Sequence, residues 1–249
     1  MKRISLAVFL LFAAIANLCA LTFADETISY KVMYKWGLIN KQAGHATITL
    51  RNQGDRYVTQ LTAASEPWAD HFFEVRDTLN GVILKDGFRP LIYEKIAHEG
   101  GEHKHDVVRF SYHGNVVRGA CSRRVVKKGR EKVNQNLELE SLGTTVDMLS
   151  SFYFMRAIPF DQWKSGQQRT VTIFSGKRKE LLSFKYHGIE TIKVGKREYR
   201  CYHITFVFTG DGGRKTSDDM DAWITADDRR IPVQMEGKLP VGKVRCQIM

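Results

Sequence analysis

Apolar and polar residues alternate with a period of two through most of this chain. In residues 28–36, for example, every even position from Ile28 to Trp36 holds a large apolar side chain. The side chains of a β-strand point alternately to its two faces, so this spacing predicts a strand with one buried face. Residues 44–50 and 57–64 repeat the pattern. The chain is therefore expected to be mainly β.

Short turn sequences separate these runs at regular intervals. Glycine occurs together with turn-forming polar residues at 52–55, 80–81, 86–87, 100–101, 113–115, 128–129, 194–196 and 210–213. Turns at this spacing join neighbouring antiparallel strands, so the pattern favours a curved antiparallel sheet or half-open barrel of meander strands. Only five prolines occur and no stretch has the composition of a linker. Residues 25–249 are therefore expected to form a single mainly-β domain.

One segment has helical spacing instead. Between residues 145 and 156, apolar residues recur at intervals of three and four. Thr144 or Thr145 can cap the first turn, and Pro159 prevents the helix from continuing. This pattern predicts one central α-helix over about residues 144–157. A smaller helical turn is expected over residues 66–72.

The first 24 residues have the layout of a cleavable secretory signal. A cationic start, Met1–Arg3, precedes an apolar run over residues 4–16 that is too short to span a membrane. Thr22 and Ala24 then place small residues at the −3 and −1 positions of a cleavage site. Residues 1–24 are therefore predicted to be a signal peptide, and the mature chain is expected to begin at Asp25.

This signal predicts a periplasmic or secreted protein. No second long apolar segment follows, so no transmembrane segment is expected in the mature chain, and nucleic acid, ATP and NAD are not expected partners. Leu18 precedes Cys19 where lipidation requires a small residue, which argues against a lipid anchor. The other cysteines, Cys121, Cys201 and Cys246, allow at most one disulfide. A Cys201–Cys246 bridge and free buried thiols both remain open.

The mature chain is strongly basic. Residues 1–24 contain two cations and no acidic residue, so their removal lowers the formal charge from +11 to +9. Such an excess favours an amphiphilic or anionic envelope molecule, such as lipid or acidic polysaccharide, as partner. General solubility is the alternative explanation.

The densest group of charges surrounds the turn at residues 128–129. Its cations are Arg123, Arg124, Lys127, Lys128 and Arg130. Clustered Arg and Lys side chains bind phosphate and carboxylate groups, so this hairpin is a candidate patch for an anionic partner. Lysine-rich hairpin tips also prevent edge-to-edge pairing of sheets, so a solvated hairpin without a partner is the alternative.

The chain contains no motif of a known catalytic site. The nucleophile elbow, the zinc-protease helix, the Walker loop and the dinucleotide fingerprint are all missing, so no catalytic residue is assigned. His98, His103 and His105 surround a polar turn, but a zinc site requires three or four converging ligands. The acidic residues between Asp218 and Asp228 lack the spacing of a calcium loop. Neither a metal nor a cofactor is expected.

Five blocks of sequence together resemble one bacterial family. These blocks are residues 30–46, 74–77, 89–93, 147–156 and 221–233. They resemble an exported family named domain of unknown function 3108. The resemblance implies a curved antiparallel sheet with a helix at its concave side, similar in outline to periplasmic lipoprotein carriers. It implies no activity, and the basic hairpin is not part of the family pattern.

These observations lead to three hypotheses of function. The first is an exported, non-enzymatic envelope protein that binds an amphiphilic or anionic envelope component. The second is an interaction module for envelope proteins or polysaccharide that takes no small ligand. The third is a hydrolase acting on envelope polymers, which as a glycosidase would need two carboxylates about 5–10 Å apart in a cleft. The oligomeric state stays open.

Candidate ligand contacts lie on the predicted helix and on aromatic strand positions. An incompletely packed helix would leave an apolar pocket with an arginine near its mouth, and complete packing would make the same aromatics ordinary core. Asp77 and Arg156 are a candidate buried ion pair that docks the helix on the sheet. The candidate ligand-binding residues are Trp36, Phe152, Tyr153, Arg156 and Trp223.

Overall fold

The computed structural model describes residues 21–210 and 213–249, so most of the predicted signal peptide lies outside the described residues. The first eight strands are β1 (Glu26–Trp36), β2 (Ile39–Gln53), β3 (Arg56–Ser65), β4 (Val75–Leu84), β5 (Pro90–Glu99), β6 (Glu102–His113), β7 (Val116–Lys127) and β8 (Arg130–Leu142). The remaining strands are β9 (Thr145–Val146), β10 (Gln168–Phe174), β11 (Lys179–Val194), β12 (Arg197–Gly210), β13 (Met220–Thr225), β14 (Pro232–Lys238) and β15 (Lys243–Ile248). The helices are α1 (Pro67–Phe73) and α2 (Ser150–Ala157), with 3-10 turns η1 (Asp86–Phe88) and η2 (Phe160–Gln162).

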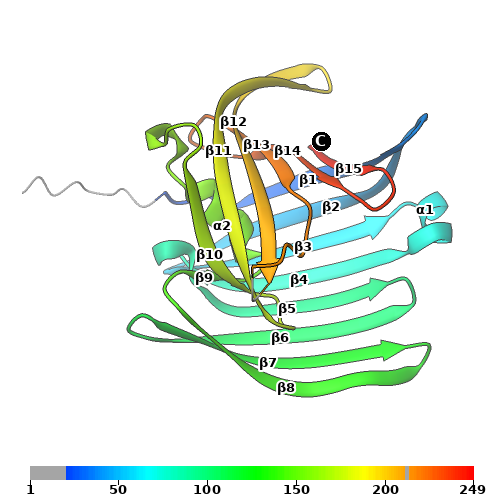
Figure 1. Cartoon of the computed structure of the whole chain (residues 1–249), viewed down its shortest axis with the longest axis vertical. Coiled ribbons are helices and arrows are strands. Elements are labelled where there is room, and N and C mark those ends of the chain that lie inside the picture. Colours follow the sequence, from blue (N-terminus) through cyan, green and yellow to red (C-terminus); the bar gives the residue numbers. More distant parts are fainter. Residues whose placement is uncertain (1–20, 211–212) are drawn as a thin grey trace, which may run out of the picture.

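All fifteen of these strands belong to one sheet. Their order is β8-β7-β6-β5-β4-β3-β2-β1-β15-β14-β13-β12-β11-β10-β9. The first and last strands, β1 and β15, pair near the middle, and an arm of strands extends from each of them, antiparallel throughout except for the parallel pair of β9 and β10. The two arms curve toward each other into a nearly closed barrel (Figure 1). The prediction of a mainly β protein with a curved antiparallel sheet is therefore confirmed.

The two arms meet at a glycine of β7, where no side chain separates them. Phe174 on β10 stacks on Phe110 of β6 with 5.7 Å between the ring centroids. A Cβ atom at Gly119 of β7 would lie only 2.7 Å from a carbon of the Phe174 ring. Near the same place, the hydroxyls of Ser141 on β8 and Thr145 on β9 are hydrogen-bonded at 2.6 Å. Closure of the barrel therefore depends on glycine at position 119.

α2 lies inside the curve of the sheet, as the family resemblance implied, but it is shorter than predicted (Figure 1). It begins at Ser150 rather than Thr144, because residues 145–146 form strand β9 beside β10. The carboxylate of Asp147 accepts the backbone N–H groups of Leu149 and Ser150, at 2.7 Å each. Asp147 therefore caps the turn that leads into α2, in place of the predicted threonine. The predicted turn over residues 66–72 is found as α1.

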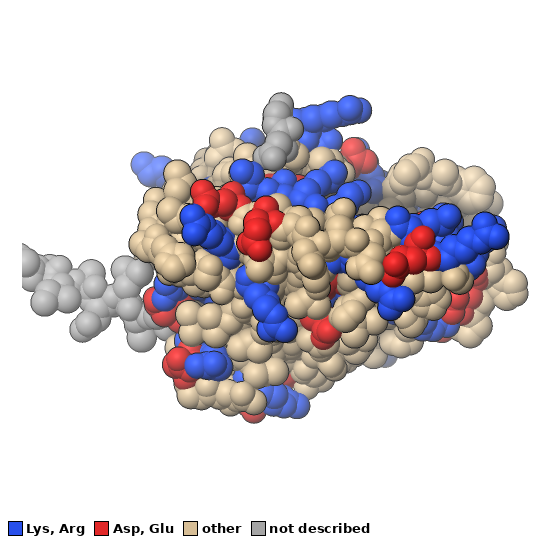
Figure 2. All heavy atoms as spheres, turned by 90° about the horizontal axis from the view of Figure 1, so that it is seen from below, with Lys and Arg blue, Asp and Glu red and all other residues tan. Residues whose placement is uncertain are grey.

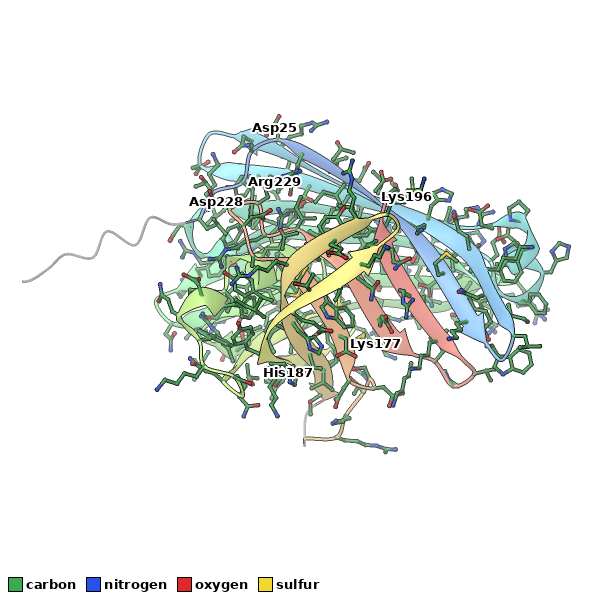
Figure 3. The ribbon with its side chains drawn as sticks, turned by 90° about the horizontal axis from the view of Figure 1, so that it is seen from above. Asp25, Lys177, His187, Lys196, Asp228 and Arg229 are labelled. Carbon is green, nitrogen blue, oxygen red and sulfur yellow. The ribbon has the colours of Figure 1, made fainter. Side chains whose placement is uncertain are left out.

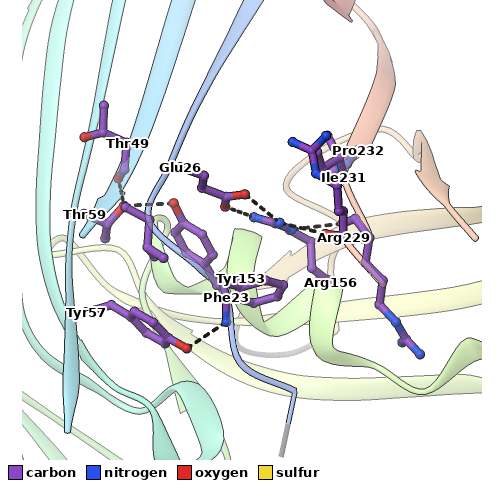
Figure 4. Close-up of polar contacts among 12 residues, drawn as sticks. Phe23, Glu26, Thr49, Tyr57, Thr59, Tyr153, Arg156, Arg229, Ile231 and Pro232 are labelled. Atoms are coloured by element: carbon purple, nitrogen blue, oxygen red, sulfur yellow. Dashed lines mark hydrogen bonds and ion pairs between the residues drawn. The ribbon is translucent and has the colours of Figure 1, made fainter. Parts of the chain in front are cut away.

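A buried arginine fixes α2 to the sheet. The Arg156 side chain is fully buried and forms a bidentate ion pair with Glu26 on β1. It also donates hydrogen bonds to the carbonyls of residues 229–230, at 2.9 Å each, in the turn before β14 (Figure 4). The predicted pair of Asp77 with Arg156 does not form, because Glu26 takes that place and Asp77 lies on β4 beside Glu99 of β5.

Aromatic side chains fill the lumen around α2. Tyr153 is fully buried and its hydroxyl lies 3.2 Å from that of Thr59 on β3. Phe154 packs against Phe184 of β11, with 6.3 Å between the ring centroids. Tyr30 of β1 is buried, and its hydroxyl donates a hydrogen bond to a carbonyl of β14. The contact between α2 and the sheet is therefore ordinary packed core.

The three described cysteines are free. Cys201 lies on β12 and Cys246 on β15, and β13 and β14 lie between them in the sheet. Of the two alternatives left open by the sequence, the structure thus has free thiols. Burial raises the pKa of Cys201 to about 12, which keeps this thiol protonated at neutral pH.

Glu26→Gln is expected to destabilise the protein strongly. The change leaves the Arg156 guanidinium buried without a counter-charge, and breaking a buried pair in this way costs about 3–5 kcal/mol of unfolding free energy. Urea denaturation at pH 7 measures the effect. The matched control is Glu140→Gln, which breaks the exposed Glu140–Arg118 pair and should change stability by less than about 0.5 kcal/mol. Equal effects of the two variants would contradict the docking role of Arg156.

Candidate functional site

The five residues predicted to contact a ligand lie in three separate places. Tyr153 and Arg156 on α2 are fully buried, and Phe152 beside them packs against the same core. Trp36 is 55% exposed at the end of β1. Trp223 lies on β13, outside this cluster. The structure therefore brings the three α2 residues together but does not form a shared pocket with the two tryptophans.

Trp223 belongs to a polar cluster on strands β11–β13. Its ring stacks on His203 with 4.8 Å between the centroids, and its indole N–H donates to Glu190 at 2.9 Å. His203 in turn bonds to Asp221 at 2.8 Å. Each polar atom in these contacts has a partner within the protein. We therefore interpret the cluster as a surface network that stabilises the sheet.

The strand register divides the inner face of β2–β7 into rows. One row is almost wholly apolar: Leu50, Thr59, Gly81, Tyr93, Val108 and Cys121. The next row becomes charged along its length: Ile48, Leu61, Leu79, Lys95, Asp106 and Arg123. A third row is Ala46, Ala63, Asp77, Ala97, Lys104 and Val125. Since Leu149 of the α2 turn packs at Gly81, the helix covers the apolar row and the charges begin beyond it.

The charged positions of these rows, together with Glu99 two residues beyond Ala97 on β5, form an inner charged cluster, which consists of Asp77, Lys95, Glu99, Lys104, Asp106 and Arg123. Glu99 receives hydrogen bonds from Lys95 at 3.1 Å and from Lys104 at 2.6 Å. Arg123 and Asp106 form a largely buried ion pair at 3.4 Å. The cluster contains three cations and three carboxylates, so its charges balance internally.

The carboxylates of the cluster differ in proton affinity. Burial raises the pKa of Asp77 to about 6, and the neighbouring Glu99 carboxylate acts in the same direction. Burial would also raise the pKa of Glu99, but the hydrogen bond from Lys104 and the charge of Lys95 lower it to about 2. One oxygen of Asp77 and one of Asp106 are buried without a hydrogen-bond partner. Of Asp77 and Glu99, Asp77 is therefore the carboxyl group that holds a proton more readily.

Two shallow hollows open on the surface, and neither matches a two-carboxylate active site. One, of about 320 Å³, lies against β2–β5 with His45, Arg76 and His98; Asp77 is the one acidic residue that lines it, and its carboxylate belongs to the inner charged cluster. The other, of about 420 Å³, has Glu140 as its one carboxylate. A glycosidase requires two carboxylates across its cleft. The geometry of these hollows therefore does not support the hydrolase hypothesis.

The histidines of the β5–β6 hairpin do not converge on one point. His98 and His103 pack against each other, with 4.3 Å between the ring centroids. His105 instead bonds to Glu94 at 2.8 Å. Among the residues that the structure describes, no group of three or more His, Cys, Asp or Glu side chains is placed to share a metal ion.

The predicted basic hairpin exists, but most of its charges are paired. Arg123 faces inward to Asp106, Arg124 pairs with Glu131, and Lys127 pairs with Glu102. Figure 2 shows basic and acidic side chains interspersed over the face that it presents. Only Lys128 and Arg130 of the five predicted cations form no ion pair with another described residue. The sequence alone did not reveal this pairing, because the partners lie on other strands or beyond the turn.

Exposed apolar side chains gather at one end of the barrel. They come from the β1–β2 turn, from α1 and from the β14–β15 turn, which lie together at the right of Figure 1. Leu38 is fully exposed and Phe72 is 83% exposed. We call this surface the docking rim, and it consists of Trp36, Leu38, Ile39, Phe72, Phe73, Leu239 and Val241.

The segments of the docking rim are held together by specific contacts. Trp68 of α1 donates its indole N–H to the Gln42 carbonyl of β2 at 2.7 Å. Tyr34 of β1 donates its hydroxyl to the Val241 carbonyl at 3.1 Å. Gly242 has a φ of +81°, and a Cβ atom there would lie 2.5 Å from a carbonyl of β1, so only glycine allows this close approach. The rim is therefore a built surface rather than a set of independent loops.

Several cations that form no ion pair with another described residue accompany the docking rim. Lys41 lies over the Trp68 ring at 4.7 Å. Lys35 and Lys243 face each other across β1 and β15 next to the rim. Lys128 and Arg130 lie at the β7–β8 turn, which reaches the same end of the barrel (Figure 1). No local sequence pattern predicts this surface, because its residues come from two turns and a helix that are far apart in the chain. The one local sign is large apolar residues within a turn sequence, as in residues 36–39.

The opposite end of the barrel carries the start of the described chain. Asp25 lies there near the turn that contains Asp228 and Arg229 (Figure 3). No helix among the described residues is long and apolar enough to cross a membrane.

Asp77→Asn is expected to stabilise the protein more at high pH than at low pH. The pKa of Asp77 is about 6 in the folded state and about 4 in an unfolded chain, so the wild type loses stability as pH rises from 4 to 6. The asparagine cannot ionise, so the Tm difference between variant and wild type should become more positive by about 3 °C between pH 4 and pH 7.5. Calorimetry at both pH values measures this, with exposed Asp228→Asn as the control. A difference independent of pH would contradict the assignment.

Comparisons with known proteins agree with the fold. The chain matches the family model of proteins of unknown function DUF3108 over residues 29–248. It is also similar to the crystal structure of a beta-barrel-like protein of domain of unknown function DUF1849 from Brucella abortus, with a TM-score of 0.62 and 9% identity over 92% of this chain and 97% of that chain. At this identity the similarity shows the fold alone. No curated protein matches the chain. The family resemblance found in the sequence is thus confirmed, and the chain belongs to the DUF3108 family.

Proposed function

We propose that this protein is an exported, non-enzymatic component of the cell envelope that attaches to anionic lipid surfaces through its docking rim. The observation that carries the proposal is the gathering, at one end of the barrel, of exposed apolar side chains and of cations that form no ion pair within the described part of the chain. Contiguous apolar surface rimmed by polar groups marks a site of interaction with a membrane or a protein. The signal-like layout of residues 1–24 supports a location in the envelope.

An anionic lipid interface matches both the apolar side chains of the docking rim and the cations near it. Tryptophan is enriched at the headgroup boundary, and phenylalanine occurs on the apolar face of segments that lie in this interface, so Trp36, Phe72 and Phe73 suit insertion there. Cations near an anionic membrane contribute about 1 kcal/mol each to binding. Lys128 and Arg130 add positive charge at the same end. Neither insertion of the apolar side chains nor attraction of the cations to anionic lipid gives stable attachment alone. Together they give reversible binding at the membrane surface.

A surface mode of binding suits this fold better than an enclosed ligand. Tyr153, Phe154 and Arg156 would have to line an acyl pocket, and all three are buried in packed contacts. The inner charged cluster beyond them balances its own charges and offers no excess cation for a lipid headgroup. An acidic protein would use the same external cations, and the experiment below separates it from lipid.

Two variants, one of the docking rim and one of the cations at the β7–β8 turn, are expected to weaken binding to anionic vesicles. Leu38→Ser with Phe72→Ser should lower affinity at least tenfold, because burying one such side chain contributes about 1.5–3 kcal/mol. Lys128→Glu with Arg130→Glu should also lower affinity at least tenfold and reduce its dependence on salt. Co-sedimentation with phosphatidylglycerol–phosphatidylethanolamine vesicles measures both effects.

The controls use residues of the same kind elsewhere on the surface. Ile189→Ser replaces another exposed apolar residue, and Lys164→Glu with Lys177→Glu reverses two exposed cations away from the rim. Both controls should bind as the wild type does, and thermal unfolding confirms that every variant is folded. Equal binding to phosphatidylcholine vesicles would overturn the role of anionic lipid. Binding to an acidic protein or polysaccharide without vesicle binding would identify an interaction module instead.

A further inference from the structure

The segment just before β1 is part of the hydrophobic core. Phe23 is 5% exposed, and its ring lies over the Arg156 guanidinium at 4.1 Å. It also packs against Phe88 and Tyr153, with ring centroids 5.5 and 5.8 Å apart. Leu21, two residues earlier, packs against the same core. These contacts involve residues that the predicted cleavage after Ala24 would assign to the signal peptide.

Backbone hydrogen bonds hold this segment in place. The N–H of Phe23 donates to the Tyr57 hydroxyl at 2.9 Å (Figure 4). Its carbonyl accepts a hydrogen bond from the Asn52 side chain at 3.1 Å. The same Asn52 amide donates to the Asp25 carboxylate at 2.8 Å. The segment is therefore bound on its backbone as well as by its ring.

Cleavage after Ala24 would remove a structural part of the domain. Loss of Phe23 would leave a cavity bounded by Phe88 and Tyr153, and would uncover one face of the Arg156 guanidinium. Tyr57 would lose its hydrogen-bond donor inside the fold. A cavity of aromatic size is among the most destabilising changes that a core can suffer.

We propose that the export signal is cleaved upstream of Phe23, so that the mature chain retains residues 21–24 as the plug that covers the Arg156–Glu26 ion pair. This inference rests on the export step of the proposed function and not on the docking rim. Alanine stands at −1 for cleavage after Ala16 and after Ala20, and Ala14 also supplies a small residue at −3 for the first of these bonds. Either cleavage keeps Phe23, whereas cleavage after Ala24 loses it.

Intact mass and N-terminal sequencing of the exported protein test this proposal directly. The full chain is expressed in a bacterium and purified from the envelope fraction. A mature terminus at Asn17 or Leu21 supports the proposal, as does a lipidated terminus at Cys19, because each retains the plug. A terminus at Asp25, or an uncleaved chain in that fraction, would overturn it. Loss of vesicle binding by rim variants is measured separately, so failure of one proposal leaves the other standing.

A pair of matched substitutions tests the structural role of the plug. Phe23→Ala in the exported protein should lower Tm by about 10 °C, because it removes a fully packed aromatic ring. Phe23→Leu, which keeps most of the volume, should lower it less and covers the case in which the alanine variant does not accumulate. Phe72→Ala removes an exposed phenylalanine and should leave Tm nearly unchanged. A wild-type Tm for both Phe23 variants would overturn the proposal.

Discussion

The ion pair between Arg156 and Glu26 is the contact on which the arrangement of this fold depends. It joins the helix in the lumen to β1, while the same guanidinium bonds to carbonyls in the turn before β14. One side chain thereby links α2 to the centre of the sheet and to one of its arms. A buried charge is costly unless it is paired and hydrogen-bonded, so these elements must assemble together. The Phe23 ring completes the shielding of this pair.

This anchoring also explains why the lumen has two different halves. Where α2 is held against the sheet, the inward positions are apolar or aromatic, as at Tyr93. In the next inward-facing row, two residues further along the strands, Lys95, Asp106 and Arg123 face the same side of the sheet. The inner charged cluster pairs most of these charged groups with one another, while one oxygen of Asp77 and one of Asp106 have no hydrogen-bond partner. The helix therefore marks the boundary between a packed core and a polar interior.

The sequence predicted what depends on local pattern and missed what depends on which strands meet. Period-two alternation gave the strands, and the apolar spacing around residues 150–157 gave the helix. The start of the helix was misplaced because Thr145 and Val146 are drawn into pairing with β10, a contact between distant residues. The predicted partner of Arg156, Asp77, lies in one of the family-like blocks, and nothing in the local sequence indicates Glu26, which is 130 residues away. The docking rim is not predictable from local pattern for the same reason, since its parts meet only in the folded protein.

The position of the docking rim relative to the filled half of the lumen favours attachment over transport. Asp25 and the turn containing Asp228 and Arg229 lie at the end of the barrel opposite the rim (Figure 3). A carrier must bring an apolar ligand from the surface into the lumen, yet the half next to α2 is closed by Tyr153 and Phe154, and the half nearer the rim is charged. On strands β4–β7, an acyl chain that entered from the rim would meet the paired charges of the inner charged cluster before it reached the apolar row that α2 covers, and displacing the partners of those charges costs free energy. The exposed apolar side chains of the rim are therefore better matched to a surface that the protein contacts than to a molecule that it encloses.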